Sequence, residues 1–170
     1  MPNYTCVTFK LTVMILVLIT AVYTPAFAGP LHDAAKTGDV VKVEQLLAAG
    51  TDANERDAGF NTALHWASDK GNLDVVRVLV EKGAEINAGT LTDRTPLGNA
   101  ALARHADVVQ FLIAKGADVN KLNEVGMSTL DDVTDWGVPD IVKMLKNAGA
   151  KCGTSDAYSR RCKEIEAQNE

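Results

Sequence analysis

The sequence predicts an all-α solenoid of four stacked helix-turn-helix units, because the same residues recur along the chain with one period of 33. Two leucine columns and one glycine column show this period. They are Leu31, Leu64, Leu97 and Leu130; Leu46, Leu79, Leu112 and Leu145; and Gly50, Gly83, Gly116 and Gly149. A fixed period of this length is the signature of repeat proteins, whose units are too small to bury a core alone and therefore stack on one another.

Two short motifs mark the beginning and the end of each repeat. The second repeat opens with Asn61-Thr-Ala-Leu-His65 and closes with Lys82-Gly-Ala-Glu-Ile-Asn87, and the third opens with Thr95-Pro-Leu97. A 33-residue period with this Thr-Pro-Leu-His-like opening resembles the ankyrin repeat. The resemblance implies two short antiparallel helices and a projecting, finger-like loop in each unit. It also implies a protein that binds other proteins rather than an enzyme.

Local signals in the second unit agree with this arrangement. Thr62 is suited to begin the first helix, Gly71 to end it and Asn72 to cap the second. Four apolar residues at helical spacing predict the buried stripe of the second helix: Val75, Val76, Leu79 and Val80. We expect a repeat domain over residues 29–150, with a finger at 84–93. Its units are expected at 30–58, 59–91, 92–124 and 125–150.

The other units depart from this pattern in informative ways. The first carries polar residues on its outward faces, as an end unit must: Lys36, Lys42, Glu44 and Gln45. In the third, Arg104 replaces a turn glycine, so either the turn is reshaped or Arg104 is strained. Gly98 stands where the repeat has histidine. In the fourth, Pro139 falls at the first position of the second helix, where its missing N–H does no harm, and Lys146 replaces an apolar residue.

The first 28 residues differ from the rest. Lys10 precedes an apolar stretch, residues 11–22, which is too short to span a bilayer comfortably and is followed by Ala26-Phe27-Ala28. This order of features predicts a signal peptide over residues 1–28 and an exported protein, periplasmic or secreted. An uncleaved anchor is the alternative. No cysteine follows the apolar stretch directly, which disfavours a lipoprotein.

Net charge narrows the classes of partner. The chain carries −5 at pH 7, and removal of residues 1–28 makes this −6 because it removes Lys10 and no acidic residue. An acidic surface is unsuited to phosphate backbones and to anionic membrane surfaces. We therefore expect no nucleic-acid partner and no membrane contact after cleavage.

The last segment, residues 151–170, is expected to form a capping tail. Ser155 is suited to cap a helix over 156–168, with Tyr158, Cys162 and Ile165 on one face. Cys6 leaves with the signal peptide, so an even pair of cysteines remains in an exported chain and predicts a Cys152–Cys162 disulfide. Two cysteines without a nearby histidine cannot fill a tetrahedral metal site, so we expect no metal.

No motif for catalysis or for a cofactor is apparent in the sequence. By the resemblance, His32 and His65 are structural and join neighbouring units, while His105 is expected to be a surface or capping residue. The acidic cluster lacks the loop spacing of a calcium site, and placement near helix N-termini explains it better. That cluster is Asp131, Asp132, Asp135 and Asp140. Trp66 is expected to pack between repeats rather than to bind a ligand.

The resemblance implies that partners bind the finger tips and the concave face of the first helices. Carried over position by position, this surface includes nine residues that we call the candidate face. They are Phe60, Asp69, Lys70, Leu91, Arg94, Leu102, Val125, Met127 and Trp136. Several are apolar where a solvated surface would be polar, which indicates an interaction site.

The sequence therefore predicts an exported, monomeric, non-enzymatic protein that binds a protein partner, for example a helper of a stress enzyme or an immunity protein. One alternative is a secreted effector that binds a host protein, and another is a self-associating structural protein. An enzyme is disfavoured because the concave face offers Asp69, Asp135 and Arg94 without a clear nucleophile or base. The partner itself is not encoded in any motif.

Overall fold

A computed structural model describes residues 29–167 of the chain. The predicted signal peptide, including Cys6, lies outside the described residues. So does Gln168, where we expected the last helix to end.

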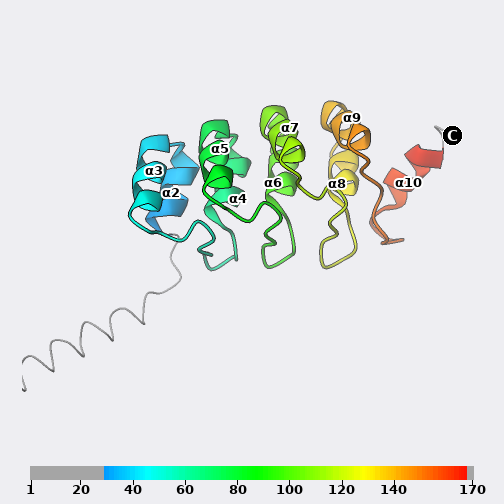
Figure 1. Ribbon diagram of the computed structural model, residues 1–170. Coiled ribbons are helices and arrows are strands. Elements are labelled where there is room, and N and C mark those ends of the chain that lie inside the picture. The colour runs from blue at the N-terminus through cyan, green and yellow to red at the C-terminus, as the bar shows by residue number, and fades with distance from the viewer. Residues whose placement is uncertain (1–28, 168–170) are drawn as a thin grey trace, which may run out of the picture.

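The described residues form a row of antiparallel helix pairs, and loops project from the same side of each pair (Figure 1). The pairs are α2 (Pro30–Thr37) with α3 (Val40–Ala48), α4 (Ala63–Lys70) with α5 (Leu73–Glu81), α6 (Pro96–Leu102) with α7 (Ala106–Ala114), and α8 (Thr129–Asp135) with α9 (Pro139–Asn147). A further helix, α10 (Arg160–Ala167), follows and packs on α8. Residues 29–167 contain no strand beyond one isolated bridge between Leu122 and Ser128. This arrangement confirms the predicted all-α repeat solenoid.

The leucine columns form the core. The first helices stack in the order α2, α4, α6 and α8, and the second helices stack beside them. Every leucine of the column that begins at Leu31 is fully buried, as are Leu79, Leu112 and Leu145 of the other column. In the predicted stripe of α5, Val75, Val76 and Leu79 are buried, whereas Val80 is only half-buried. Because each leucine packs between units, the period seen in the sequence is the period of the core.

The expected helix boundaries are mostly confirmed. α4 ends at Gly71, whose φ is 71°, and α9 begins with Pro139. Arg104 has a φ of 65°, so the third unit keeps the left-handed turn and places a non-glycine residue in it. Such a residue costs roughly 1–2 kcal/mol. The sequence left open a reshaped turn or strain at Arg104, and the structure shows strain.

Asn72 plays a different part from the one expected. It precedes α5 but makes no side-chain hydrogen bond to that helix. Its amide donates instead to Ala35 O at 2.8 Å and to Lys36 O at 3.2 Å, at the end of α2. Asn72 therefore satisfies free carbonyl groups of the preceding unit, which helix ends need, and joins two repeats.

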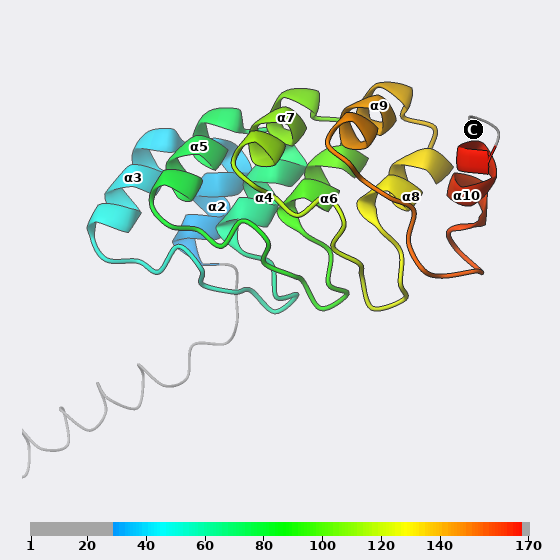
Figure 2. The same ribbon diagram turned by 45° about the vertical axis from the view of Figure 1, so that its right-hand side comes forward.

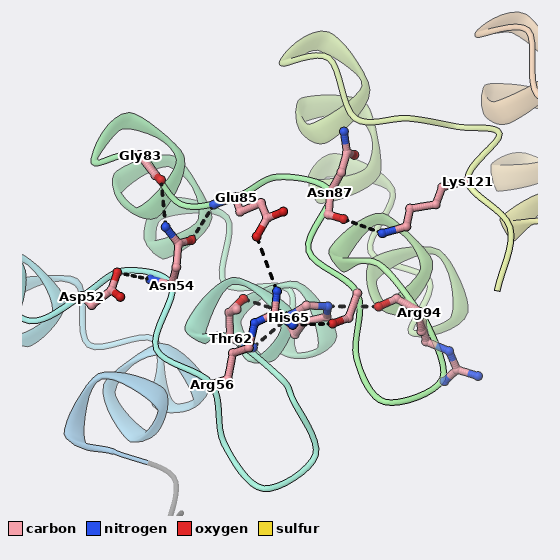
Figure 3. Close-up of polar contacts among 11 residues, drawn as sticks. Asp52, Asn54, Arg56, Thr62, His65, Gly83, Glu85, Asn87, Arg94 and Lys121 are labelled. Atoms are coloured by element: carbon pink, nitrogen blue, oxygen red, sulfur yellow. Dashed lines mark hydrogen bonds and ion pairs between the residues drawn. The ribbon is translucent and has the colours of Figure 1, made fainter. Parts of the chain in front are cut away.

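Buried histidines also join neighbouring units, as the resemblance implied. The backbone N–H of Thr62 donates to His65 Nδ1, so the proton of the neutral ring lies on Nε2, which donates to Arg94 O at 3.1 Å (Figure 3). His32 Nε2 lies 3.1 Å from both Glu55 O and Asn61 O in the same way. His105, expected to be a surface or capping residue, stands at the N-cap position of α7. It is half-buried, and its Nε2 donates to Asp69 O at 3.0 Å, at the end of α4. It is a third link between units.

Asparagines at the same period add a second set of links. Asn54 Oδ1 accepts the backbone N–H of Glu85 at 2.7 Å, and Figure 3 shows this amide between two neighbouring units. Asn87 accepts from Asp118 N at 2.9 Å. Asn120 accepts from Lys151 N at 2.8 Å, although Lys151 belongs to the tail. The tail therefore starts along the path that a further repeat would take.

The tail is anchored by Asp131, which stands in the fourth unit where the first and second have His32 and His65. Its carboxylate is fully buried. Asp131 Oδ2 accepts from Ser128 N at 2.7 Å and Oγ at 3.0 Å, from Gly153 N at 2.7 Å and from Ser159 Oγ at 2.9 Å. Asp131 does lie in the first turn of α8, as expected, but its main role as a buried acceptor for the tail was not predicted.

This anchor explains why the last helix begins later than expected. α10 starts at Arg160 rather than at Asp156. Residues 156–159 form a turn because Ser159 is fully buried and directs its hydroxyl to Asp131. Tyr158 consequently lies outside the helix and is exposed, not on the face of Cys162 and Ile165. Cys152 and Cys162, the predicted pair, are joined by a disulfide in the structure.

No helix among the described residues is long and apolar enough to cross a membrane.

Protonation of His65 should make stability depend on pH. Burial lowers the pKa of His65 from 6.5 to about 4. Between these values the unfolded chain binds a proton that the folded protein does not. The free energy of unfolding is therefore highest above about pH 6.5. It falls by roughly 3 kcal/mol as the pH is lowered towards 4. Urea unfolding at several pH values checks this. His65→Gln should show a smaller loss over the interval, and an equal loss in both proteins would contradict the prediction.

Gly153 should be needed for the anchor. A Cβ at this position would collide with Gly126 O and Asp131 Oδ2, which are fixed by their own contacts. Gly153→Ala is therefore expected to lower the free energy of unfolding by roughly 1–3 kcal/mol, the usual cost of overpacking. The exposed neighbour Thr154 supplies the control Thr154→Ala, which should change stability little. Equal effects of the two substitutions, measured by thermal unfolding, would show that Gly153 is not tightly packed.

Candidate functional site

Three fingers of the same construction project beneath the helices, side by side (Figure 2). They are residues 57–61, 90–94 and 123–127, called here the first, second and third fingers. Two backbone hydrogen bonds close each finger. In the first they run from Asp57 N to Asn61 O and from Phe60 N to Asp57 O, both at 2.9 Å, and the other two fingers have the equivalent pair. Leu91 N also donates to Gly59 O at 3.2 Å, which ties the second finger to the first. The fingers are therefore ordered by their own backbone.

The penultimate residue of each finger has left-handed backbone geometry. It is Phe60 with a φ of 60°, Asp93 with 56° and Gly126 with 76°. Glycine adopts this geometry readily and aspartate fairly often, but for a bulky residue it is an outlier. The Phe60 side chain is 49% exposed, so burial does little to offset the strain. Backbone strain of this kind is concentrated at functional sites.

Asp57 organises the first finger. Its Oδ1 accepts the backbone N–H groups of Gly59 and Asn61, both at 2.8 Å, and its Oδ2 accepts the indole N–H of Trp66 at 2.9 Å. Burial alone would raise the pKa of Asp57, but the hydrogen bonds from Asn61, Trp66 and Gly59 outweigh it and lower the pKa. One carboxylate thus fixes both the turn that carries Phe60 and the ring of Trp66.

A hollow of about 340 Å³ opens between the first and second fingers. It is lined by Gly59, Asn61, Trp66, Asp69, Thr90, Leu91, Thr92, Arg94 and Asn99. The structure thus brings together three members of the candidate face: Asp69, Leu91 and Arg94. The hollow combines an aromatic wall, an exposed leucine, two amides and charges of both signs. These are the groups with which protein interfaces recognise side chains.

Trp66 was expected only to pack between repeats. It does so, because the ammonium group of Lys36 in the first unit lies 4.7 Å from its ring centroid. It is nevertheless half-exposed and forms one wall of the hollow. Its position on a helix between small buried residues, Ala63 and Ala67, concealed this second role. No signal in the sequence pairs its indole N–H with the carboxylate of Asp57, nine residues earlier, because the contact depends on the turn between them.

The space between the second and third fingers is much smaller, about 10 Å³. Arg94, Met127 and Asp132 are among its lining residues. Burial raises the pKa of Asp132, and the charges of Asp131 and Asp135 add to this while Arg94 opposes it. Met127 is half-buried here and therefore offers a partner less surface than we expected of an anchor. Figure 3 shows the guanidinium of Arg94 pointing away from the hydrogen bond that its carbonyl makes with His65.

The remaining members of the candidate face do not line the larger hollow. Lys70 forms an ion pair with Asp69 at 2.9 Å, and Leu102 is half-buried. Val125 is 46% exposed on the third finger, and Trp136, which follows α8, is 71% exposed. The nine residues therefore form no single pocket. They are distributed over the fingers and the ends of the first helices.

This combination of stacked helix pairs, ordered fingers and a hollow between fingers defines a repeat solenoid with a side suited to binding. Sequence models of ankyrin repeats match the chain twice. The description "Ankyrin repeats (3 copies)" matches residues 24–90 and "Ankyrin repeat" matches residues 92–124. The chain belongs to the ankyrin repeat family. Proteins of this family are in general non-enzymatic protein–protein interaction modules. No curated protein compared with the chain matches it.

Restoring a histidine at Gly98 should stabilise the protein. Gly98 occupies the position of His32 and His65, and a Cβ there would closely approach only the flexible side chain of Arg94, at 3.1 Å. His32 bonds to Asn61 O and His65 to Arg94 O, each 29 residues further on, so by the same pattern an imidazole at position 98 would meet Met127 O. Gly98→His also removes a helical glycine, and we expect a gain of about 1–2 kcal/mol in the free energy of unfolding. Gly98→Ala is the matched control for the backbone effect. If the histidine variant is no more stable than the alanine variant in urea unfolding, the position cannot support the link.

Proposed function

We propose that this protein is an exported binding module that recognises one protein partner through the candidate face, without catalysis. The observation that carries the proposal is the exposure of large apolar side chains on the fingers and beside the first helices. Phe60, Leu91, Val125 and Trp136 are between 46% and 71% exposed. They lie outside the buried core, and large exposed apolar side chains on the fingers and at the ends of the first helices favour an interaction site.

The fingers suit this role because their geometry exists before the partner arrives. Backbone hydrogen bonds close each finger, and Asp57 holds both the turn of Phe60 and the ring of Trp66. A surface that is already ordered loses little conformational entropy when it binds, so more of the contact energy appears as affinity. Leu91, Arg94 and Trp136 are the main anchors we propose, and the half-buried Met127 is a smaller contact beside them. Of these, Leu91 and Trp136 are the most exposed.

The predicted signal peptide supports the export part of the proposal. The signal peptide predicted over residues 1–28 would deliver the chain to the periplasm or the outside of the cell, where a Cys152–Cys162 disulfide would persist. A partner in that compartment, such as a stress enzyme or a toxin neutralised by an immunity protein, fits the charge and the surface. A secreted effector that binds a host protein is the alternative, because the same surface would serve a target in another cell.

Capture of a partner from the cell envelope tests the proposal. The chain from Gly29 onward is the bait, and a second bait carries Leu91→Ala, Met127→Ala and Trp136→Ala. Buried interface anchors typically contribute more than 1 kcal/mol each, so the second bait should bind the captured protein roughly 100-fold more weakly or worse. Mass spectrometry identifies the protein, and titration of the purified pair measures the affinity.

A matched control uses exposed apolar residues outside the candidate face. Val41 on α3 and Tyr158 in the tail are 63% and 55% exposed. A bait with Val41→Ala and Tyr158→Ala should retain the partner. Equal capture by all three baits would place the binding surface elsewhere. Capture of a second copy of this chain would instead assign the apolar residues to self-association.

A further inference from the structure

One carboxylate oxygen of Asp131 takes no part in anchoring the tail. Its Oδ2 accepts four hydrogen bonds from Ser128, Gly153 and Ser159, whereas its Oδ1 is buried and has no hydrogen-bond partner. Asp131 is also the only fully buried acidic side chain among residues 29–167. A buried carboxylate oxygen without a partner is costly, and in native proteins it calls for a specific explanation.

The two cysteine sulfurs lie next to this carboxylate. One oxygen of Asp131 and the Sγ atoms of Cys152 and Cys162 are all within 4.8 Å of one another. Cys162 is buried, and Cys152 is half-buried, so the cluster is open to solvent on the side of Cys152. Three groups that can bind a metal therefore converge from two distant parts of the chain, α8 and the tail.

We propose that the dithiol form of this protein binds one zinc ion through Cys152 Sγ, Cys162 Sγ and Asp131 Oδ1. Sequence spacing disfavoured a metal because it showed two cysteines and no third ligand. The structure supplies that third ligand from Asp131, which lies 21 residues before Cys152 in the chain. Water on the open side of Cys152 completes a tetrahedral site, the geometry that zinc prefers.

The dimensions of the cluster suit such a site. Zinc–sulfur and zinc–oxygen bonds of about 2.3 and 2.0 Å place neighbouring ligand atoms of a tetrahedron roughly 3.5–4 Å apart. One carboxylate oxygen of Asp131 and the two bonded sulfurs already lie within 4.8 Å of one another. Once the sulfurs are no longer bonded, rotation of the two cysteine side chains would separate them to the spacing that zinc requires.

The surroundings also favour a cation. Two thiolates and a carboxylate would place three negative charges in a largely buried cluster, and a divalent ion offsets two of them. The four hydrogen bonds to Oδ2 hold the carboxylate so that Oδ1 remains free. Hydrogen bonds that orient a ligand in this way are typical of metal sites and raise their affinity.

The conversion of the disulfide form into the zinc-bound dithiol form balances in atoms and electrons. A phosphine reductant gives two electrons to the Cys152–Cys162 bond and becomes a phosphine oxide, while one water molecule supplies its oxygen and the two protons of the thiols. Zinc then displaces those two protons to solvent as the zinc–sulfur bonds form. The tail would thus be attached to α8 by zinc when the cysteine pair is reduced and by the disulfide when it is oxidised.

Cobalt binding to the reduced protein tests the proposal. The full chain carries Cys6→Ser, so that only the pair contributes thiols, and it is reduced with a phosphine and kept free of oxygen. We expect one equivalent of Co²⁺ to give thiolate-to-cobalt charge-transfer bands and the intense visible bands of a tetrahedral site. Zn²⁺ should displace the cobalt and raise the Tm of the reduced protein. Absence of the charge-transfer bands would overturn the proposal.

Two variants assign the ligands. Cys152→Ala should abolish the bands, and Asp131→Asn should weaken cobalt and zinc affinity by about tenfold or more. Circular dichroism establishes that each variant is folded before titration. If Asp131→Asn does not fold, Ser159→Ala replaces it, because loss of one donor to Oδ2 should still weaken metal binding measurably. Unchanged affinity in the folded aspartate or serine variant would overturn the site. The oxidised protein is the negative control, and cobalt bands there would also contradict the proposal.

Discussion

The hydrogen bond between a buried imidazole and a carbonyl of the following finger sets the position of one repeat relative to the next. In the first two units this bond joins the interior of a helix pair to the base of the next finger. It depends on a neutral ring whose Nδ1 accepts and whose Nε2 donates. The leucine columns provide most of the buried surface. Apolar packing has little directional preference, however, and the polar links between units fix the stacking geometry.

The same requirement explains the end of the solenoid. After the fourth unit the chain offers N–H and O–H groups of the tail instead of the carbonyls of another finger. An imidazole that donates through Nε2 would have no carbonyl acceptor there, whereas a carboxylate accepts several hydrogen bonds at once. Asp131 takes the position of the histidine and receives the hydrogen bonds of Gly153 and Ser159. Replacement of a donor by an acceptor thus converts a link between repeats into a link to the cap.

Much of the fold could be predicted from the sequence, because the 33-residue period reflects contacts that each unit repeats. The exceptions are residues whose partners lie in another unit or in the tail. Asn72 was expected to cap its own helix, but a pattern along one chain segment does not reveal the free carbonyls of α2 opposite it. Trp66 and Asp131 were assigned incomplete roles for the same reason. The residues of the candidate face were predicted from their positions within the repeat. The hollow at Arg94 depends on the spacing of two fingers, which only the three-dimensional structure shows.

The capping tail also borders the candidate face. In a solenoid each unit contacts only its neighbours, so on one side the last unit depends on the cap, where α10 packs on α8. Arg161 of α10 donates to Asp135 O at 3.1 Å, one residue before the exposed Trp136. The contacts that cover the core of the fourth unit thus extend to the edge of the surface proposed to bind a partner. The position of Trp136 is consequently tied to the attachment of the tail, through Asp131 and the Cys152–Cys162 pair.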